Sequence, residues 1–252
     1  MGDGPVAGGA VDMSRRPIIR YSATTHVGLV RKVNEDSILA APEARIWAVA
    51  DGMGGHAAGD VASQTVIDAL ALVPQGLDPA ALMQGVREAL HRAHARIQAE
   101  AAARHVEAMG ATVVALALAD GHFVAFWAGD SRLYRFRDRE VELLTTDHSA
   151  VAELVLSGQI TWDEAELHPM SNIVTRAVGV GEVLQLDKVR GELRPGDRFL
   201  ICSDGLSRYA GFETLRRLVP GAPIETVTDT LLGLALAGGA RDNVSIIVID
   251  VV

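Results

Sequence analysis

Short apolar runs bounded by Gly, Asp or Asn recur along the chain and predict β-strands, because β-branched and aromatic residues suit a pleated sheet. These runs are residues 18–25, 45–50, 111–119, 122–128, 133–137, 198–202 and 244–252. Asp120-Gly121, between two of the runs, is a strong signal for a hairpin turn. Strands joined by tight turns predict antiparallel pairing.

A second pattern places apolar residues three and four positions apart, which is the spacing of one face of a helix. It occurs in residues 58–72, in a long segment after Asp78-Pro79, and in residues 223–236. Asp78 suits the N-cap of a helix and Pro79 suits its first position. Because helices and hairpin strands are grouped rather than alternating, we predict an α+β fold with antiparallel sheets and helices packed outside them.

Two stretches differ from these regular elements. Residues 1–17 are rich in Gly and small side chains, so we expect a disordered lead-in, with Met13 as a second candidate start. No linker interrupts residues 18–252, so we expect a single domain there. Within it, residues 148–180 carry short helical patterns among irregular sequence, and we interpret them as a small insertion, or flap, beside the core.

Composition narrows the class of protein. The 252 residues are 49% apolar and 22% charged, which is enough apolar material for a core without disulfides. The net charge of −9 argues against binding to nucleic acid or to an anionic membrane, since both need clustered Lys and Arg. Cys202 is the single cysteine, which favours a reducing compartment.

Targeting signals are also part of the expectation. Every apolar run is far shorter than the ~20 residues of a membrane-spanning helix. Residues 1–10 lack the basic start and apolar centre of a signal peptide. We therefore expect a cytoplasmic protein. A monomer is expected as well, because no coiled-coil pattern or exposed apolar stripe calls for a partner copy.

Three acidic motifs adjoin apolar runs and point to a metal site. They are Asp51-Gly52 after residues 46–50, Asp204-Gly205 after residues 199–202, and Asp242-Asn243 before residues 244–249. One Asp-Gly alone would indicate only a turn. Carboxylates held at rigid strand ends can converge, however, and Mg²⁺ and Mn²⁺ prefer such oxygen ligands. Together with Asn34-Glu35-Asp36, they predict a site for two divalent ions that hydrolyses a phosphate ester.

Seven short motifs follow one another between residues 20 and 252. They are GLVR (28–31), NEDS (34–37), ADGMGGH (50–56), GDSR (129–132), DHS (147–149), SDGL (203–206) and RDNVS (241–245). Each is weak alone, but the ordered series resembles the metal-dependent type 2C protein phosphatases in their compact bacterial form. The resemblance implies a central antiparallel β-sandwich flanked by helices on both sides, in α-β-β-α layers. It also implies hydrolysis of phosphoserine and phosphothreonine in proteins.

The resemblance further implies a set of metal ligands. Asp51 matches the carboxylate that bridges two Mn²⁺ or Mg²⁺ ions, and the Gly52 carbonyl matches a ligand of the second ion. Asp204 and Asp242 match further ligands of the first ion. Asp130 matches the residue that, with Asp204, binds a third and weaker ion in bacterial members. In such proteins a water bridging the two ions attacks phosphorus directly.

The same resemblance implies roles for residues around the ions. Glu35 and Asp36 match positions that hold metal-bound waters, and Arg31 matches the arginine that binds the substrate phosphate. Met53 stands where animal members carry a histidine that is thought to protonate the leaving group. Methionine cannot donate a proton, so His56 nearby, or a metal-bound water, is the candidate general acid.

Two functional readings of this family remain open. The first is a protein phosphatase that opposes a bacterial serine/threonine kinase, with phosphorylated proteins as substrates. The second is a catalytically weak, phosphoprotein-binding regulatory module of the same fold, which relatives become when they lose metal ligands. All the matched acidic residues are present here, which favours catalysis.

Patterns from other classes of protein compete with this interpretation. Cys202 and Arg208 fit the Cys-x₅-Arg loop of cysteine-dependent phosphatases, but the thiol ends an apolar run, which favours a buried strand cysteine. Residues 52–57 fit the Gly-x-Gly-x-x-Ala dinucleotide fingerprint, which is weak when it stands alone. His91 and His94 lie three residues apart on a predicted helix and could form a metal pair, although a solvated helix face suits them better.

Overall fold

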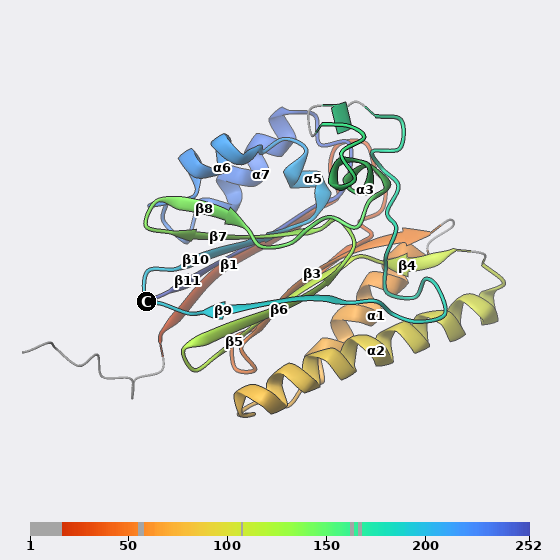
Figure 1. Cartoon of the computed structure of the whole chain (residues 1–252), viewed down its shortest axis with the longest axis horizontal. Coiled ribbons are helices and arrows are strands. Elements are labelled where there is room, and N and C mark those ends of the chain that lie inside the picture. The colour runs from red at the N-terminus through yellow and green to blue at the C-terminus, as the bar shows by residue number, and fades with distance from the viewer. Residues whose placement is uncertain (1–16, 55–57, 107, 162–163, 166–167) are drawn as a thin grey trace, which may run out of the picture.

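The computed structural model describes residues 17–54, 58–106, 108–161, 164–165 and 168–252. Within them, two β-sheets pack face to face and helices cover the outer face of each sheet (Figure 1). Every strand pair among the described residues is antiparallel. The predicted α+β sandwich with α-β-β-α layers is therefore confirmed.

The first sheet has the strand order β1-β11-β10-β7-β8. Its strands are β1 (Ile19–His26), β7 (Arg132–Arg137), β8 (Glu140–Leu143), β10 (Arg198–Cys202) and β11 (Val244–Val251). Three helices pack on its outer face, namely α5 (Asp204–Ser207), α6 (Phe212–Leu218) and α7 (Val227–Ala237). Leu206, Leu215 and Leu231, one from each helix, are fully buried against this sheet.

The second sheet has the strand order β2-β3-β5-β6-β9, with β4 paired to the end of β3. Its strands are β2 (Asp36–Ala41), β3 (Ile46–Gly54), β4 (Met109–Ala111), β5 (Val113–Ala119), β6 (His122–Ala128) and β9 (Asp187–Glu192). Helices α1 (Gly59–Ala71) and α2 (Pro79–Arg104) cover its outer face. The short helix α3 (Ala150–Leu156) belongs to the segment predicted as a flap.

The layer between the two sheets explains why the central strands are apolar throughout instead of alternating. Trp47 and Val49 of β3 face the other sheet, while Ile46 and Ala48 face the helices, so both sides of the strand are buried. Across this layer, the rings of Phe123 and Phe199 meet edge to face with centroids 5.2 Å apart.

Several of the elements that the sequence pattern did not predict are edge strands. The missed strands β2, β8 and β9 all lie at sheet edges. Every second residue of β9 is charged and exposed, namely Lys188, Arg190 and Glu192. The strand therefore lacks the apolar run that predicted the others. The short helices α5 and α6 were also missed, and the helix predicted over residues 223–236 begins at Val227.

Strand direction brings the acidic motifs to one end of the sandwich. Cys202, the last residue of β10, pairs with Ile246 near the start of β11, so the residues just beyond both strands lie together. In the other sheet, Asp36 pairs directly with Asp51. Asp51 lies inside β3 rather than after it, which extends the predicted strand.

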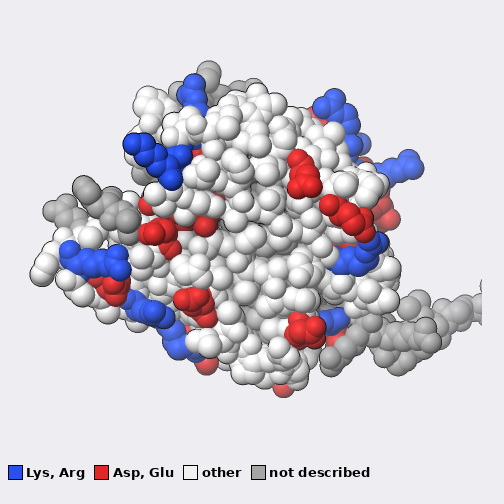
Figure 2. Space-filling model, turned by 180° about the vertical axis from the view of Figure 1, so that it is seen from behind, with Lys and Arg blue, Asp and Glu red and all other residues white. Residues whose placement is uncertain are grey.

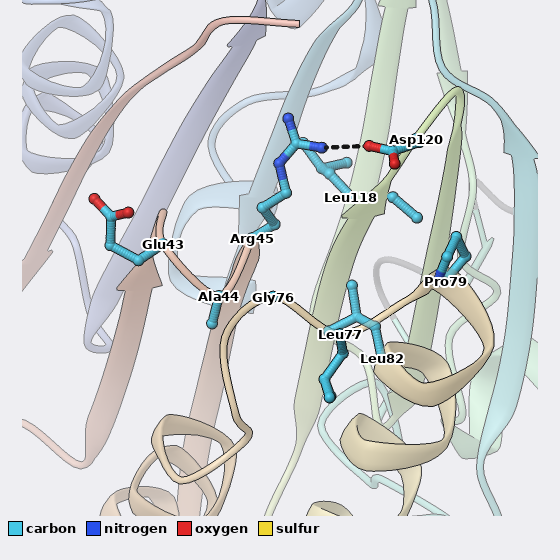
Figure 3. A pocket seen from close by; sticks show the side chains of 10 residues that line it. Glu43, Ala44, Arg45, Gly76, Leu77, Pro79, Leu82, Leu118 and Asp120 are labelled. Atoms are coloured by element: carbon cyan, nitrogen blue, oxygen red, sulfur yellow. Dashed lines mark hydrogen bonds and ion pairs between the residues drawn. The ribbon is translucent and has the colours of Figure 1, made fainter. Parts of the chain in front are cut away.

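The opposite end of the second sheet contains a pocket that is separate from these motifs (Figure 3). It lies between the β2–β3 turn, the β5–β6 turn and the start of α2. Its charged side chains include Arg45 and Asp120, which form an ion pair with N and O 3.5 Å apart. Arg45 precedes β3, whereas Asp51 lies further along the same strand, so the pocket and the acidic motifs are at different ends.

The surface is mixed in charge. On the face in Figure 2, the described Lys and Arg side chains stand apart near the margins, with Asp and Glu between them. This differs from the continuous basic stripe of a nucleic-acid-binding face. Among the described residues, no helix has the length and apolar character needed to cross a membrane.

We predict that Asp78→Ala destabilises the protein by about 1 kcal/mol, the usual contribution of an N-cap side chain. The Asp78 carboxylate accepts hydrogen bonds from the Ala80 and Ala81 backbone N–H groups, both at 2.9 Å, and thereby caps α2. Denaturant unfolding measures the change. Glu88→Ala in the same helix is the control, because its ion pair with Arg92 is exposed and should contribute under about 0.5 kcal/mol. Equal effects of the two substitutions would contradict the capping role.

Candidate metal centre

Five aspartates from separate segments of the chain interact electrostatically with one another. Asp36 and Asp51 face each other across β2 and β3. Asp130 lies between β6 and β7, Asp204 is the first residue of α5, and Asp242 precedes β11. The pKa of Asp51 is raised by the charges of all four others, after burial as the largest cause. The carboxylates that the sequence predicted to converge are therefore brought together.

Burial and, to a smaller extent, neighbouring negative charges raise the pKa values in this cluster. Burial raises the pKa of Asp36 and of Asp130 to about 7, and in both cases the charge of Asp204 adds to the rise. Burial also raises the pKa of Asp51 well above its usual value and raises that of Asp204. A divalent cation would relieve this repulsion, because it favours the ionised carboxylates.

In two of the carboxylates, one oxygen accepts a hydrogen bond and the other has no hydrogen-bond partner among the described residues. The Ser203 hydroxyl donates to Asp36 Oδ2 at 2.8 Å, and Arg208 Nε donates to Asp204 Oδ2 at 3.0 Å. Oδ1 of Asp36 and Oδ1 of Asp204 are buried without a hydrogen-bond partner among the described residues. Buried polar atoms normally have partners, so these oxygens suit a hard cation.

The donor chemistry fits Mg²⁺ or Mn²⁺, although the side chains are not arranged as a finished coordination shell. In the part of the chain that the structure describes, no group of three or more His, Cys, Asp and Glu side chains has the geometry to hold one ion. The fit therefore rests on the free carboxylate oxygens, the raised pKa values and the common end of the sandwich.

Gly52 lies where three backbone segments touch. Its N–H donates to the Glu35 carbonyl at 3.0 Å. A Cβ at this position would lie 2.0 Å from the Gly59 carbonyl oxygen at the start of α1, so only glycine fits. The Glu35 carboxylate accepts from the Gly59 backbone N–H, which lowers its pKa, but burial is the larger effect and raises it. Gly52 thus brings Glu35 beside the aspartates.

Arg31 supplies a cation at the rim of the cluster. Its Nη2 donates to Asp242 Oδ2 at 2.8 Å, and this hydrogen bond is the main cause of its raised pKa. The side chain is 51% exposed, and Asp242 is its hydrogen-bond partner among the described residues. The remaining guanidinium N–H groups can bind an anion such as a phosphate.

A buried histidine supports the segment that carries Asp130. His148 Nδ1 accepts from the Gly129 N–H at 3.2 Å, and its Nε2 lies 3.1 Å from Asp187 Oδ2. Its carbonyl accepts from the Thr175 N–H at 2.8 Å. His148 therefore joins the Asp130 segment to the segment predicted as a flap.

Arg208 and Ser203 are functional candidates to which the sequence analysis gave no role at the metal centre. Arg208, the residue after α5, pairs with Asp204 four residues earlier, and this spacing could have been noticed in the sequence. The Ser203–Asp36 contact joins residues 167 positions apart, and no local pattern could predict it. His56, a candidate proton donor, lies outside the described residues. Met53, which stands where animal members carry a histidine, is part of β3.

The competing patterns do not match the structure. Cys202 is fully buried, and burial raises its thiol pKa to about 12, so it is not the low-pKa thiolate of a cysteine-dependent phosphatase. Arg208 contacts Asp204 instead of a phosphate loop around the thiol. The glycine fingerprint begins within β3, whose neighbours are all antiparallel, whereas a dinucleotide fold needs parallel strands.

The expectation of a solvated face for the histidine pair is wrong for one member. His91 is exposed, but His94 is buried, and its Nδ1 accepts from the Gly179 N–H at 2.9 Å. The end of the flap packs on α2 so closely that a Cβ at Gly179 would lie 2.3 Å from Ile97 Cγ2. Burial lowers the pKa of His94, so a structural role explains this residue.

Known proteins match most of the chain. Residues 30–231 match the family model of protein phosphatase 2C. The serine/threonine protein phosphatase PstP of Mycobacterium tuberculosis is 41% identical over 236 residues, which cover 93% of this chain and 45% of the relative. The chain thus spans less than half the length of that relative.

Solved structures are similar over nearly their whole length. PppA of Pseudomonas aeruginosa, a key regulatory component of T6SS, is 42% identical with a TM-score of 0.87, covering 93% of this chain and 98% of that one. The catalytic domain of a serine/threonine phosphatase PstP, in complex with two manganese ions, is 40% identical with a TM-score of 0.82. This match covers 94% of the present chain and all of the other.

We predict that Mn²⁺ binding releases protons at about pH 6 and few at about pH 8.5, because nearby cations favour the ionised forms of Asp36 and Asp130, whose pKa values are about 7. Calorimetric titration in buffers of different ionisation enthalpy counts these protons. Without metal, the raised pKa values stabilise the fold below about pH 4, and this contribution is lost as the pH rises through about 7. Equal proton release at both pH values would contradict the assignment.

Proposed function

The chain belongs to the protein phosphatase 2C family, and from this membership we propose that it hydrolyses phosphoserine and phosphothreonine in proteins with the help of two divalent metal ions. The observation that carries the proposal is the group of buried carboxylates with raised pKa values beside a half-exposed Arg31. The carboxylates suit the binding of two metal ions, and the ions together with Arg31 suit the binding of a phosphate group.

The proposed ligands come from four separate segments of the chain. Asp51 would bridge two Mn²⁺ or Mg²⁺ ions, and the Gly52 carbonyl would bind the second. Asp204 and Asp242 would bind the first, with the buried Oδ1 of Asp204 as its donor. Asp130, with Asp204, would hold a third and weaker ion. When bound, such ions supply an activated water and neutralise charge on the phosphate.

Residues around the ions would bind and orient the reactants. Glu35 and Asp36 would accept hydrogen bonds from water at the centre, and the Ser203 hydroxyl holds Asp36 in place for this role. Arg31 would bind two phosphate oxygens through parallel N–H groups and so fix the phosphorus for in-line attack. Met53 offers no proton for the leaving group, so we infer that His56 or a water at the centre donates it.

The substrates that we propose are phosphorylated proteins. The proposed partner is a serine/threonine kinase, and the phosphatase removes the phosphate groups that this kinase adds. The similarity to PstP, a serine/threonine protein phosphatase, supports this class of substrate. We further infer that residues 18–252 act as one catalytic domain, since the family model spans residues 30–231 within it.

We predict that the protein hydrolyses p-nitrophenyl phosphate with Mn²⁺ and that EDTA abolishes the activity. Asp51→Asn and Asp242→Asn should lower kcat/KM by at least about 10³, because each removes a charged ligand. Cys202→Ser should retain activity, since the thiol is buried. Activity that resists EDTA, or that depends on Cys202, would exclude the metal mechanism. Phosphopeptide binding without any turnover would instead favour the regulatory module.

We predict that Arg31→Ala raises KM for a phosphopeptide by about tenfold or more, because a charge-assisted bidentate contact contributes roughly 1.5–3 kcal/mol. Steady-state kinetics with saturating Mn²⁺ measure the change. Arg92→Ala, an exposed arginine on α2, is the control and should change neither constant. Unchanged kcat and KM in Arg31→Ala would remove Arg31 from the phosphate site.

A further inference from the structure

The side chain of Asn243 forms three hydrogen bonds with one stretch of the chain, residues 27–35. Its Nδ2 donates to the Val27 carbonyl at 2.9 Å and to the Val33 carbonyl at 3.0 Å, and its Oδ1 accepts from the Glu35 N–H at 2.8 Å. Only one orientation of the amide fits, because a flipped amide would place an oxygen against two carbonyl oxygens. Asn243 is 5% exposed, so water competes little for these bonds.

These bonds close the segment that carries Arg31, here named the Arg31 loop (residues 27–33). Both of its ends are within 3.0 Å of a single nitrogen atom. Between them, the Leu29 N–H donates to the Ala240 carbonyl at 2.8 Å. A Cβ at Gly28 would lie 2.2 Å from the Asp242 carbonyl oxygen, so the loop rests directly on the backbone before Asn243.

Asn243 is itself firmly placed among the carboxylates. Its carbonyl oxygen packs against Gly205, where a Cβ would lie only 1.8 Å away, and Gly205 follows Asp204. Its N–H donates to Asp242 Oδ1 at 3.0 Å. The same residue thus touches two acidic motifs and both ends of the Arg31 loop.

We propose that Asn243 is a positioning residue, which holds the Arg31 loop so that the guanidinium stands over the carboxylate cluster before substrate arrives. The inference rests on the proposed function, in which Arg31 binds the substrate phosphate. A loop fixed in advance loses little conformational entropy on binding, so phosphate affinity depends on Asn243 even though Asn243 does not touch the phosphate. Removing the amide frees both loop ends and lowers that affinity.

The test compares Asn243→Ala, Arg31→Ala and the double variant in the Mn²⁺-loaded protein. Calorimetry measures the Kd of inorganic phosphate and of Mn²⁺, and kinetics with p-nitrophenyl phosphate give kcat and KM. Asn243→Ala should weaken phosphate binding about tenfold and raise KM by a similar factor, with a smaller effect on kcat. The Kd of Mn²⁺ should stay within about twofold, because all the proposed ligands remain. Gln84→Ala, an exposed amide on α2, is the matched control.

The double variant separates positioning from a merely structural role. If Asn243 acts through Arg31, adding Asn243→Ala to Arg31→Ala should weaken phosphate binding no further. Effects that multiply, or an unchanged phosphate Kd in Asn243→Ala, overturn the inference. Should Asn243→Ala fail to fold, Asn243→Ser keeps a polar group at the site and is read in the same way. Wild-type protein that neither binds phosphate nor hydrolyses the substrate would instead refute the proposed function.

Discussion

Mutual repulsion among buried carboxylates is the constraint on which the rest of this structure depends. Left alone, side chains of like charge move apart or take up protons. Burial is the main cause of the raised pKa values of Asp36, Asp51 and Asp130, and the charges of neighbouring carboxylates raise these values further. The fold resists it with stiff elements, since β3 and β10 are buried on both faces. The free energy that the core contributes is thus what keeps the aspartates together.

Close backbone contact is the second requirement, and it explains why glycines accompany the acidic residues. Gly52 and Gly205 each lie where a Cβ would be 2.0 Å or less from a carbonyl oxygen of another segment. A side chain at either position would separate elements by several tenths of an ångström or more, and a metal site tolerates little displacement of its ligands. The rigid strands and the two glycines, which allow close backbone contact, therefore act together in placing the carboxylates.

Much of this arrangement could be predicted from the sequence. The central strands, the capped helix α2 and the acidic motifs are local signals, because burial on two faces, a cap and an Asp-Gly pair each leave a mark within a few residues. Edge strands such as β9 leave no such mark, since their exposed faces accept charged residues. Long-range hydrogen bonds escape prediction for a different reason. Ser203 and Asp36 meet across the sandwich only once both sheets have formed.

The pairing of β1 with β11 has a consequence for the nascent chain. The Arg31 loop follows β1, whereas the amide that closes it precedes β11, and the residues they join are separated by 208 to 216 positions. During synthesis, Arg31 therefore leaves the ribosome long before Asn243, the residue that anchors its loop. Contacts so distant in sequence form late in folding. Partly synthesised chains consequently cannot close the Arg31 loop, because the amide that joins its two ends is not yet present.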